Sequence, residues 1–473
     1  MPTRAKAKRT KAKSAVKKPA RKAPVAAEHR IARSALERIA ERVFKFSRAD
    51  ETEVAIDATT DALTRFANNT IHQNVAERGI SISVRAAVDG RTARVTTNKT
   101  DDDSLARAAQ SAERLARLQP PSENLLPMPG RQKYPAVKRF FPATAAATPE
   151  DRARAVVRVV NLASERGQTA AGIYSTGISQ TALANSRGLF AYYEQTRAEF
   201  SVTFLESGSS GWAKANSGDI RQIDPEALAQ SASQKALDSR EPREIPSGHY
   251  TVILEPAAVL DLVGFLFYDF AATAVEDQRS CFTGRLGKQL LGQHITIWDD
   301  AYHPLQAGPP FDGEGVPRQK VLLVDRGVPK NLVYSRGSAK RLGAKPTGHG
   351  MPLPNEWGEA PLNIVFAGGK SSIEEMIAST GQGILVTRFW YIREVDPYQK
   401  ILTGMTRDGT FLVENGRVAG ALKNFRFNQS IIEMLASVEA LGTPVRAAGE
   451  ESFEMVVPAM KARNFHFTEM TKF

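Results

Sequence analysis

The sequence predicts an α+β protein in which N-terminal helix–sheet domains precede a mostly antiparallel, barrel-like C-terminal β domain with one buried central helix. Three observations lead to this prediction. Amphipathic helical patterns and alternating strand patterns are mixed in the first half of the chain. Short strand patterns separated by glycine turns fill the second half. Between them, residues 255–277 form the longest strongly apolar run, with apolar side chains at helical spacing.

The composition is that of an ordinary globular protein. Of the 473 residues, 42% are hydrophobic and 24% are charged, which fits two or three domains. The single cysteine, Cys281, excludes an internal disulfide framework and any zinc site built from several cysteines. Asp261 and Asp269 interrupt the long apolar run, so we predict no membrane span and no membrane partner. No signal peptide is recognisable, and a cytoplasmic location is expected.

Most of the net charge of +12 lies near the N-terminus. The first 26 residues contain ten Lys or Arg and no acid, and we expect residues 1–30 to be a disordered basic tail. Its candidate polyanion-binding residues are Lys6, Lys8, Arg9, Lys11, Lys13, Lys17, Lys18, Arg21 and Lys22. One interpretation is an arm that binds nucleic-acid phosphates, with an affinity that falls as salt rises. The other is a solubilising extension that binds polyanions only incidentally.

Residues 31–120 are predicted to form an N-terminal α/β domain. An amphipathic helix is expected at 32–47 and a strand at 53–57. Alternating residues around Asp89-Gly90 indicate a hairpin, and a helix with acids in its first turn follows at 100–118. The domain is therefore a small layer of helices on a sheet.

Residues 121–149 are rich in proline and predict an extended linker. Residues 150–243 are predicted to form a middle α/β domain, which begins with a helix at 150–166. Strands follow, and then a Ser/Gly-rich segment, 207–219, that is expected to be a loop. A second helix, capped by Asp224, closes the domain.

Residues 244–473 are predicted to form the C-terminal β-rich domain around the central helix. Turn sequences such as Asp408-Gly409 separate its short strands. A short helix at 371–379 is expected to be capped by Ser371 and Glu374. Asp261 and Asp269 lie on broadly the same side of the central helix. They either line an internal cavity or lie on the solvent-exposed side of a half-buried helix, and we favour the solvent-exposed side.

His294, Asp300 and His303 belong to the densest cluster of metal-ligand types, between a strand and the following turn. A metal site requires these elements to converge; otherwise the residues form a polar strand end, which we favour. No two histidines stand at i, i+4 on a helix, so neither HExxH nor HExxxH is present. We interpret the lone cysteine, Cys281, as a small core residue rather than a nucleophile.

A glycine-rich segment contains Thr347, Gly348 and His349. It offers either a loop that contacts substrate in a peptide cavity or a rigid surface loop, and we favour the rigid loop.

Three segments together resemble the TldD/PmbA family, historically called modulators of DNA gyrase. They are RFANNTIHQN at 65–74, residues 311–350, and FLVENGRVAGALKNFRFNQS at 411–430. The resemblance covers essentially the whole chain after the basic tail. The block at 311–350 is its most specific part, because an acidic-Gly turn, strands and an Arg-Leu-Gly…Thr-Gly loop come in the family's order.

The resemblance implies a heterodimer that cleaves unfolded peptides inside a cavity. The TldD-type subunit carries zinc on an HExxxH central helix, with a further cysteine ligand near its C-terminus, and the PmbA/TldE-type subunit lacks these ligands. In this chain the corresponding helix has Phe265, Phe267, Tyr268 and Asp269 and no histidine, and no cysteine follows Ser430. The chain is thus closest to the PmbA/TldE type, with no catalytic residue of its own.

The resemblance therefore implies no metal or cofactor in this chain and zinc in the partner subunit. The expected partners are an HExxxH-bearing paralogue and unfolded peptides, with nucleic acid as a candidate partner of the tail. Two alternatives stay open. One is an independent hydrolase with a non-standard metal site at His294, Asp300 and His303. The other is a DNA-associated protein that acts through its basic tail.

Overall fold

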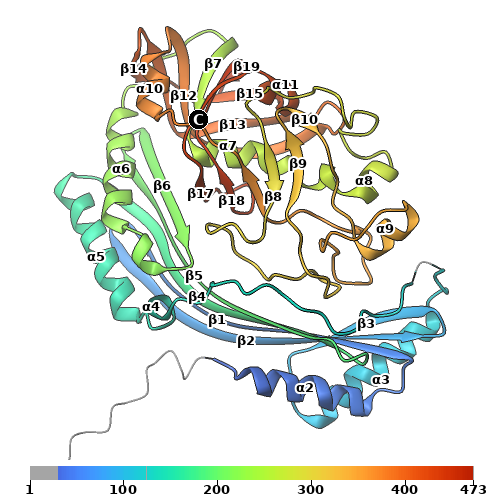
Figure 1. Ribbon diagram of the computed structural model, residues 1–473. Helices are drawn as coiled ribbons and strands as arrows, with labels where there is room; N and C mark the ends of the chain where they lie inside the picture. Colours follow the sequence, from blue (N-terminus) through green and yellow to red (C-terminus); the bar gives the residue numbers. More distant parts are fainter. Residues whose placement is uncertain (1–29, 124, 472–473) are drawn as a thin grey trace, which may run out of the picture.

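The computed structural model describes residues 30–123 and 125–471, and the α+β prediction is confirmed. A long arched sheet carries a C-terminal domain that contains a closed barrel (Figure 1). The predicted polyanion-binding residues, from Lys6 to Lys22, lie outside the described residues. No helix in the described ranges is long and apolar enough to cross a bilayer.

The long sheet has six antiparallel strands in the order β3-β2-β1-β4-β5-β6. The strands are β1 (Glu51–Ala67), β2 (Thr70–Val88), β3 (Arg91–Thr97), β4 (Thr169–Asn185), β5 (Phe190–Glu206) and β6 (Ser209–Ser217). Strand β1 pairs with β4, so the segments 31–120 and 150–243 build one continuous sheet.

At the predicted hairpin, Asp89 and Gly90 both have positive φ (49° and 71°) and join β2 to β3. This is the conformation that a tight hairpin turn requires.

The segment 207–219, expected to be a loop, instead contains β6, so this prediction was wrong. Its small residues fit a strand that packs closely under a helix. A Cβ on Gly211 would lie 2.1 Å from the carbonyl oxygen of Ala232 in α6. Ala213 joins the same hydrophobic core as that helix. The Ser/Gly-rich composition reflects this close approach rather than an irregular backbone.

Helices lie against both ends of the sheet (Figure 1). They are α2 (Arg33–Phe46) and α3 (Asp102–Leu118) at one end, and α4 (Pro142–Ala145), α5 (Pro149–Glu165), η1 (Ile220–Gln222) and α6 (Pro225–Asp238) at the other. Helix α5 begins with a capping box between Thr148 and Asp151, and Asp224 caps α6 as predicted. Leu36 and Val43 of α2 enter one buried core, whereas Val156 of α5 enters a second.

Five strands of the C-terminal domain form a closed barrel, because β12 pairs with β13 as well as with β7. They are β7 (Gly248–Leu254), β12 (Gln382–Asp396), β13 (Ile401–Glu414), β15 (Phe425–Ser430) and β19 (Met460–Met470). Strands β14 (Arg417–Ala421) and β16 (Val438–Leu441) extend it. Apart from the parallel β7–β12 pair, the barrel is antiparallel, as the sequence predicts.

A second six-stranded sheet packs beside the barrel in the order β10-β9-β8-β11-β18-β17. Its strands are β8 (Ile297–Asp299), β9 (Val321–Asp325), β10 (Val328–Pro329), β11 (Ile364–Phe366), β17 (Val445–Ala447) and β18 (Met455–Val457). The domain's short helices are α9 (Arg336–Arg341), α10 (Ile373–Ala378) and α11 (Ile431–Ala436). Ser372 and Glu375 cap α10, one residue beyond the predicted pair Ser371 and Glu374.

The central helix is divided into α7 (Pro256–Val263), the 3₁₀ segment η2 (Gly264–Phe270) and α8 (Ala272–Glu276), so a continuous helix over the apolar run was wrong. The backbone turns extended at Ala271. There the N–H of Ala272 donates to the carbonyl of Val333, and the N–H of Val333 donates to Phe270. These hydrogen bonds to a segment far along the chain replace the i→i−4 backbone hydrogen bonds of a continuous helix. We call residues 256–276 the central segment.

The C-terminal domain is joined to the long sheet by alternate residues of β6. The contacts pair Ser210 with Asp408 (2.5 Å), Trp212 with Arg388 (4.8 Å from Cζ to the ring centroid), Lys214 with the carbonyl of Gly449 (3.0 Å) and Asn216 with Arg446. Because side chains alternate along a strand, the opposite face of β6 is left for α6. Strand β6 is therefore one of the connections between the two parts, beside contacts such as that of Arg94 with the carbonyl of Leu353 and that of Gln195 with the N–H of Gly308.

Arg388→Met tests this junction. Arg388 and Asp408 are almost fully buried, and the Arg388 Nε donates to Asp408 at 2.8 Å. Removing the guanidinium leaves the buried Asp408 with only the Ser210 hydroxyl and the more distant Arg407, at 3.7 Å, and we expect the free energy of unfolding to fall by about 3 kcal/mol in urea titrations. The control is Arg426→Met, which removes an exposed pair with Glu469 and should cost less than about 1 kcal/mol. Equal losses in the two variants would contradict the assignment.

Candidate functional site

The central segment presents aromatic side chains toward the protein surface. Phe267 packs edge-on against Phe453, with ring centroids 5.2 Å apart, and lies 6.4 Å from Tyr268. Tyr268 in turn packs edge-on against Trp357 at 4.9 Å. Trp357 is 57% exposed, and Phe265, Phe267 and Tyr268 are half-buried. We call Phe267, Tyr268, Trp357 and Phe453 the aromatic surface.

Asp269 of the central segment is held in a buried ion pair. The Lys400 Nζ lies 2.6 Å from Asp269 and 2.7 Å from Glu394. The backbone N–H of Cys281 donates to the other Asp269 oxygen at 2.7 Å. Burial acts to lower the pKa of Lys400, but Asp269 and Glu394 hold it above its ordinary value. The lysine is therefore an ammonium that neutralises the carboxylate.

Cys281 lies in the core, as the sequence predicts. Its side chain is 1% exposed and belongs to the main hydrophobic cluster of the C-terminal domain. Burial raises the pKa of the Cys281 thiol, and the nearby Asp269 raises it further. The thiolate form needed for nucleophilic attack or metal binding is thus disfavoured.

Asp261 is fully buried, and Asp269 is 2% exposed. The prediction that the two residues lie on a solvent-exposed side of the central helix was therefore wrong. Asp261 Oδ2 accepts from the N–H of Phe389 at 3.2 Å, whereas Oδ1 has no hydrogen-bond partner among the described residues. Burial raises the pKa of Asp261 to about 7, against the opposing effects of the Phe389 N–H and Arg388. A lone carboxyl is tolerated here because it can take up a proton near neutral pH.

The donors of the central segment do not fit zinc. Besides Asp269, its carboxylate Glu276 pairs with Arg341 at 2.6 Å, and the next residue, Asp277, pairs with Arg279 at 2.7 Å. Structural and catalytic zinc sites in proteins take imidazole and thiolate ligands for the most part. Within residues 30–123 and 125–471, no three His, Cys, Asp or Glu side chains converge on a point that could hold a metal. We therefore derive no metal-dependent step in this chain.

His294, Asp300 and His303 are not brought together as a ligand set. Asp300 forms an ion pair with Lys320 at 3.0 Å. His303 Nδ1 accepts from the N–H of Leu305, and burial lowers the pKa of His303. His294 is exposed three residues before β8, whereas Asp300 follows that strand. The arrangement is that of a polar strand end.

Gly348 and His349 are buried and Thr347 is half-buried, so the segment is not the surface loop favoured from the sequence. His349 is 1% exposed, and its Nε2 lies 2.9 Å from Asp299. Burial would raise the pKa of Asp299, but the neighbouring His349 and Arg318 hold it below its ordinary value. Gly348 has φ +74°, and a Cβ there would lie 2.2 Å from the carbonyl of Pro317. The segment has no regular secondary structure, as expected for a loop, and its contact with a peptide cavity stays a prediction.

Buried carboxylates in the block 311–350 and next to it were not predicted from the sequence. Asp312 accepts backbone N–H groups of Glu314, Val316 and Gly350 at 2.8–2.9 Å. Glu359 accepts from the N–H of Thr273 at 2.7 Å, beside the central segment. Acidic residues near glycine turns are the only signal in the sequence. These carboxylates fix the loops around the central segment.

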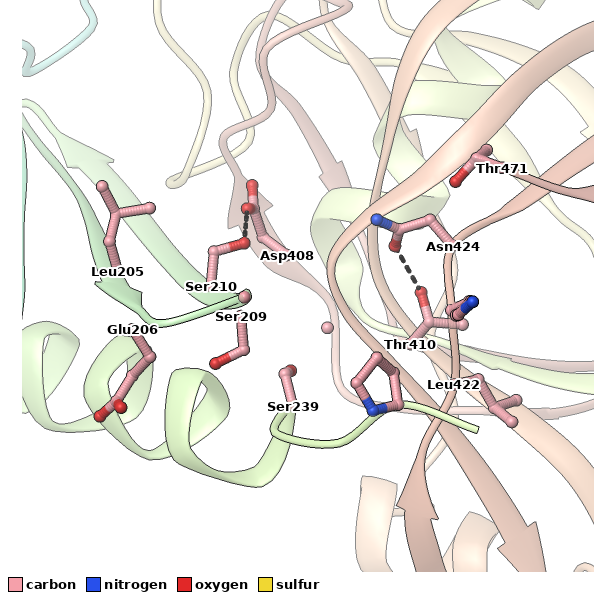
Figure 2. Close-up of a pocket in the computed structure, with 14 residues that line it drawn as sticks. Leu205, Glu206, Ser209, Ser210, Ser239, Asp408, Thr410, Leu422, Asn424 and Thr471 are labelled. Carbon is pink, nitrogen blue, oxygen red and sulfur yellow. Dashed lines mark hydrogen bonds between the residues drawn. The ribbon is translucent and has the colours of Figure 1, made fainter. Parts of the chain in front are cut away.

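Two cavities of the described chain lie away from the central segment. The larger, about 490 Å³, opens between the end of β5, the start of β6 and the barrel (Figure 2). Its lining is mixed: Leu205 and Leu422 stand beside two hydrogen-bonded pairs, in which Ser210 donates to Asp408 and Thr410 donates to Asn424. The smaller, about 380 Å³, lies against the barrel beside His249 and His466.

Profiles of one protein family match most of the chain. The PmbA/TldA metallopeptidase domain 1 matches residues 52–116, the central domain of that family matches 139–240, and its C-terminal domain matches 247–469. The solved structure of TldE from Thermococcus kodakarensis superposes with a TM-score of 0.83 at 22% identity, covering 92% of this chain and 99% of that one. At that identity, the likeness establishes the fold.

Curated relatives carry metalloprotease names. The chain is 22% identical to the metalloprotease PmbA of Escherichia coli O157:H7 over 437 residues, which are 88% of this chain and 92% of that protein. It is 24% identical to a metalloprotease of Methanothermobacter thermautotrophicus over 303 residues, 58% of this chain. The match spans 64% of the length of that relative and 48% of the metalloprotease MJ0996 of Methanocaldococcus jannaschii.

Asp261→Asn tests the burial of this carboxyl. A pKa raised in the fold means that the contribution of Asp261 to stability is greatest below its unfolded pKa of about 4 and declines as pH rises through the folded value. With a folded pKa of about 7, we expect the variant to gain stability relative to the wild type between pH 5 and 7, by at most about 1.4 kcal/mol per pH unit. Urea titrations across pH 5–8 measure this difference. A difference that stays constant across this pH range would refute the assignment.

Proposed function

The chain belongs to the PmbA/TldA metallopeptidase family, and we propose that it is the non-catalytic subunit of a two-chain zinc metallopeptidase that acts on unfolded peptides. The proposed partner is a paralogue whose central helix carries HExxxH. In this assignment the zinc and its activated water belong to the paralogue. The present chain completes the enclosure in which the peptide is cut.

The composition of the central segment carries the proposal. In the stretch where the resemblance expects HExxxH, this chain has Phe265, Phe267 and Tyr268 and no histidine. The adjacent carboxylate, Asp269, is already neutralised by Lys400 at 2.6 Å. Cys281 is buried behind that ion pair with a raised thiol pKa. A chain with these groups can retain the fold of a peptidase without supplying its ligands.

The aromatic surface gives this subunit a means of contacting peptides. Trp357 is exposed and packs on the ring of Tyr268. The Arg279 guanidinium lies over the same Tyr268 ring, with its Cζ 5.8 Å from the ring centroid. Flat aromatic faces bind many apolar side chains without requiring one sequence. An unfolded peptide, whose apolar residues are uncovered, fits such a surface better than a folded protein does.

The two alternatives from the sequence gain no specific support. The hypothesis of an independent hydrolase requires His294, Asp300 and His303 to converge on a metal ion. Asp300 instead forms an ion pair with Lys320. The DNA-associated reading depends on the basic tail, which lies outside the described residues. Neither is carried further.

Co-expression with an HExxxH-bearing paralogue from the same genome tests the proposal. We expect the two chains to co-purify and to cleave an unfolded peptide faster than the paralogue alone. This chain by itself should be inactive, because its central segment lacks zinc ligands. Replacing the glutamate of the paralogue's HExxxH by Gln should abolish cleavage, since it removes the general base. If the chain neither binds the paralogue nor changes its cleavage, the proposal fails.

Trp357→Ala tests the aromatic surface in the same complex. We expect the complex to assemble normally and its KM for an unfolded apolar-rich peptide to rise about tenfold, because a large aromatic contact is lost. The matched control is Leu118→Ala, which removes another exposed apolar side chain at the end of α3, 79% exposed. Equal KM values in the two variants would rule out a peptide-binding role for Trp357.

A further inference from the structure

More than half of strand β2 is an open edge of the long sheet. Strand β3 pairs with β2 only from Ile82 to Val88, at one end (Figure 1). From Thr70 to Ser81, β2 pairs with β1 on one side, and no strand of the described chain pairs with its other side. Residues 72–74 and 76–79 are exposed, so both faces of the strand are open to solvent as well as its edge. We call residues 70–81 the open edge.

The backbone groups of the open edge are placed for pairing with another strand. Val88 and Arg91 close the two-residue turn at Asp89-Gly90, and such a closing pair is hydrogen-bonded. Because backbone directions alternate along an antiparallel strand, even-numbered residues of β2 direct their N–H and C=O groups away from β1. The register between β1 and β2 has no shift between positions 73 and 87 of β2. The outward-directed residues of the open edge are therefore Asn74, Ala76, Arg78 and Ile80.

Two copies of the open edge can pair with each other in few registers. A two-fold axis perpendicular to the sheet makes the two strands antiparallel and keeps each face of the sheet on the same side. Residues that lie opposite each other must then share a face, so the register is centred on a single residue. A centre beyond residue 76 would place the second strand where β3 already pairs with Ile82.

Residue 75 is the centre that complements the side chains best. Val75 of one copy then meets Val75 of the other, and Gln73 lies opposite Glu77 on the same face. The amide of Gln73 can donate to the carboxylate of Glu77 twice, once in each direction. A centre at residue 76 would place Glu77 opposite Val75. With residue 75 as the centre, the outward backbone groups of Asn74 meet those of Ala76.

We propose that two copies of this chain dimerise through their open edges, in an antiparallel register centred on Val75. The two long sheets then form one sheet that runs across the dimer. The pairing satisfies a row of backbone groups that would otherwise be a template for unspecific association. A second copy suits the open edge better than an unfolded peptide, because its strand is already extended and loses little backbone entropy on pairing.

Sedimentation velocity of the untagged full chain over a series of concentrations tests the dimer. We expect a mass near twice the 51.6 kDa of one chain. Ala76→Pro should weaken dimerisation by about tenfold or more, because two hydrogen bonds are lost, one from each copy. The pairing with β1 is unaffected, since the N–H of Ala76 points outward. Ala76→Ser keeps that N–H and is the matched control, and circular dichroism checks the fold of both variants.

Disulfide cross-linking tests the register. Two residues at its centre lie directly opposite each other, at a spacing that a disulfide can bridge. Val75→Cys should therefore link the two copies under mild oxidation. Ser81→Cys is the matched control, because its two copies lie about 40 Å apart in this register. The native Cys281 is 1% exposed and does not take part.

A chain that stays monomeric at every concentration would overturn the proposal, and this is the outcome expected if a peptide occupies the open edge instead. A dimer that Ala76→Pro leaves unchanged would also overturn it, as would a cross-link at residue 81 and none at residue 75. The measurements use this chain alone and need no peptide cleavage. Their result is therefore independent of the proposed peptidase role.

Discussion

The ion pair between Lys400 and Asp269 decides what the centre of the C-terminal domain can do. Lys400 lies between β12 and β13 of the barrel, and Asp269 lies in η2. Their charged atoms are 2.6 Å apart with both side chains almost fully buried. A buried ammonium without a carboxylate would be far too costly to keep, and the reverse is equally true. The pair therefore binds the central segment to the barrel and, at the same time, leaves the Asp269 carboxylate unavailable to a metal ion.

The same principle of paired or satisfied buried charge recurs throughout the architecture. Asp312 accepts the backbone N–H of Gly350, and Glu359 accepts that of Thr273 in the central segment. At the junction with the long sheet, Arg388 lies against Trp212 and binds Asp408. Asp261 departs from this pattern, because its Oδ1 has no hydrogen-bond partner in the described chain, and burial raises its pKa to about 7. Arg152, 1% exposed, likewise has guanidinium nitrogens without a partner there. The block 311–350, the most specific part of the family resemblance, thus has mainly a structural role. In the proposed function, the aromatic surface is the part of this chain that contacts the peptide.

Local patterns in the sequence were sufficient for the fold class and for most helix ends. The turn at Asp89-Gly90 and the cap at Asp224 depend on a few neighbouring residues, and both were predicted correctly. The break in the central helix at Ala271 could not be predicted, because its cause is pairing with Val333, far along the chain. For the same reason β6 was taken for a loop: its small residues are required by contact with α6.

The lack of histidine in the central segment is visible in the sequence alone, but the burial of Asp261 and the pairing of Asp269 with Lys400 could not be predicted. The direct test of the central claim is an anomalous-difference map at the zinc absorption edge for crystals of this chain with an HExxxH-bearing paralogue. A zinc peak at the paralogue's motif, with none beside Asp269, is the expected result. A peak within bonding distance of residues 265–277 of this chain would contradict the account.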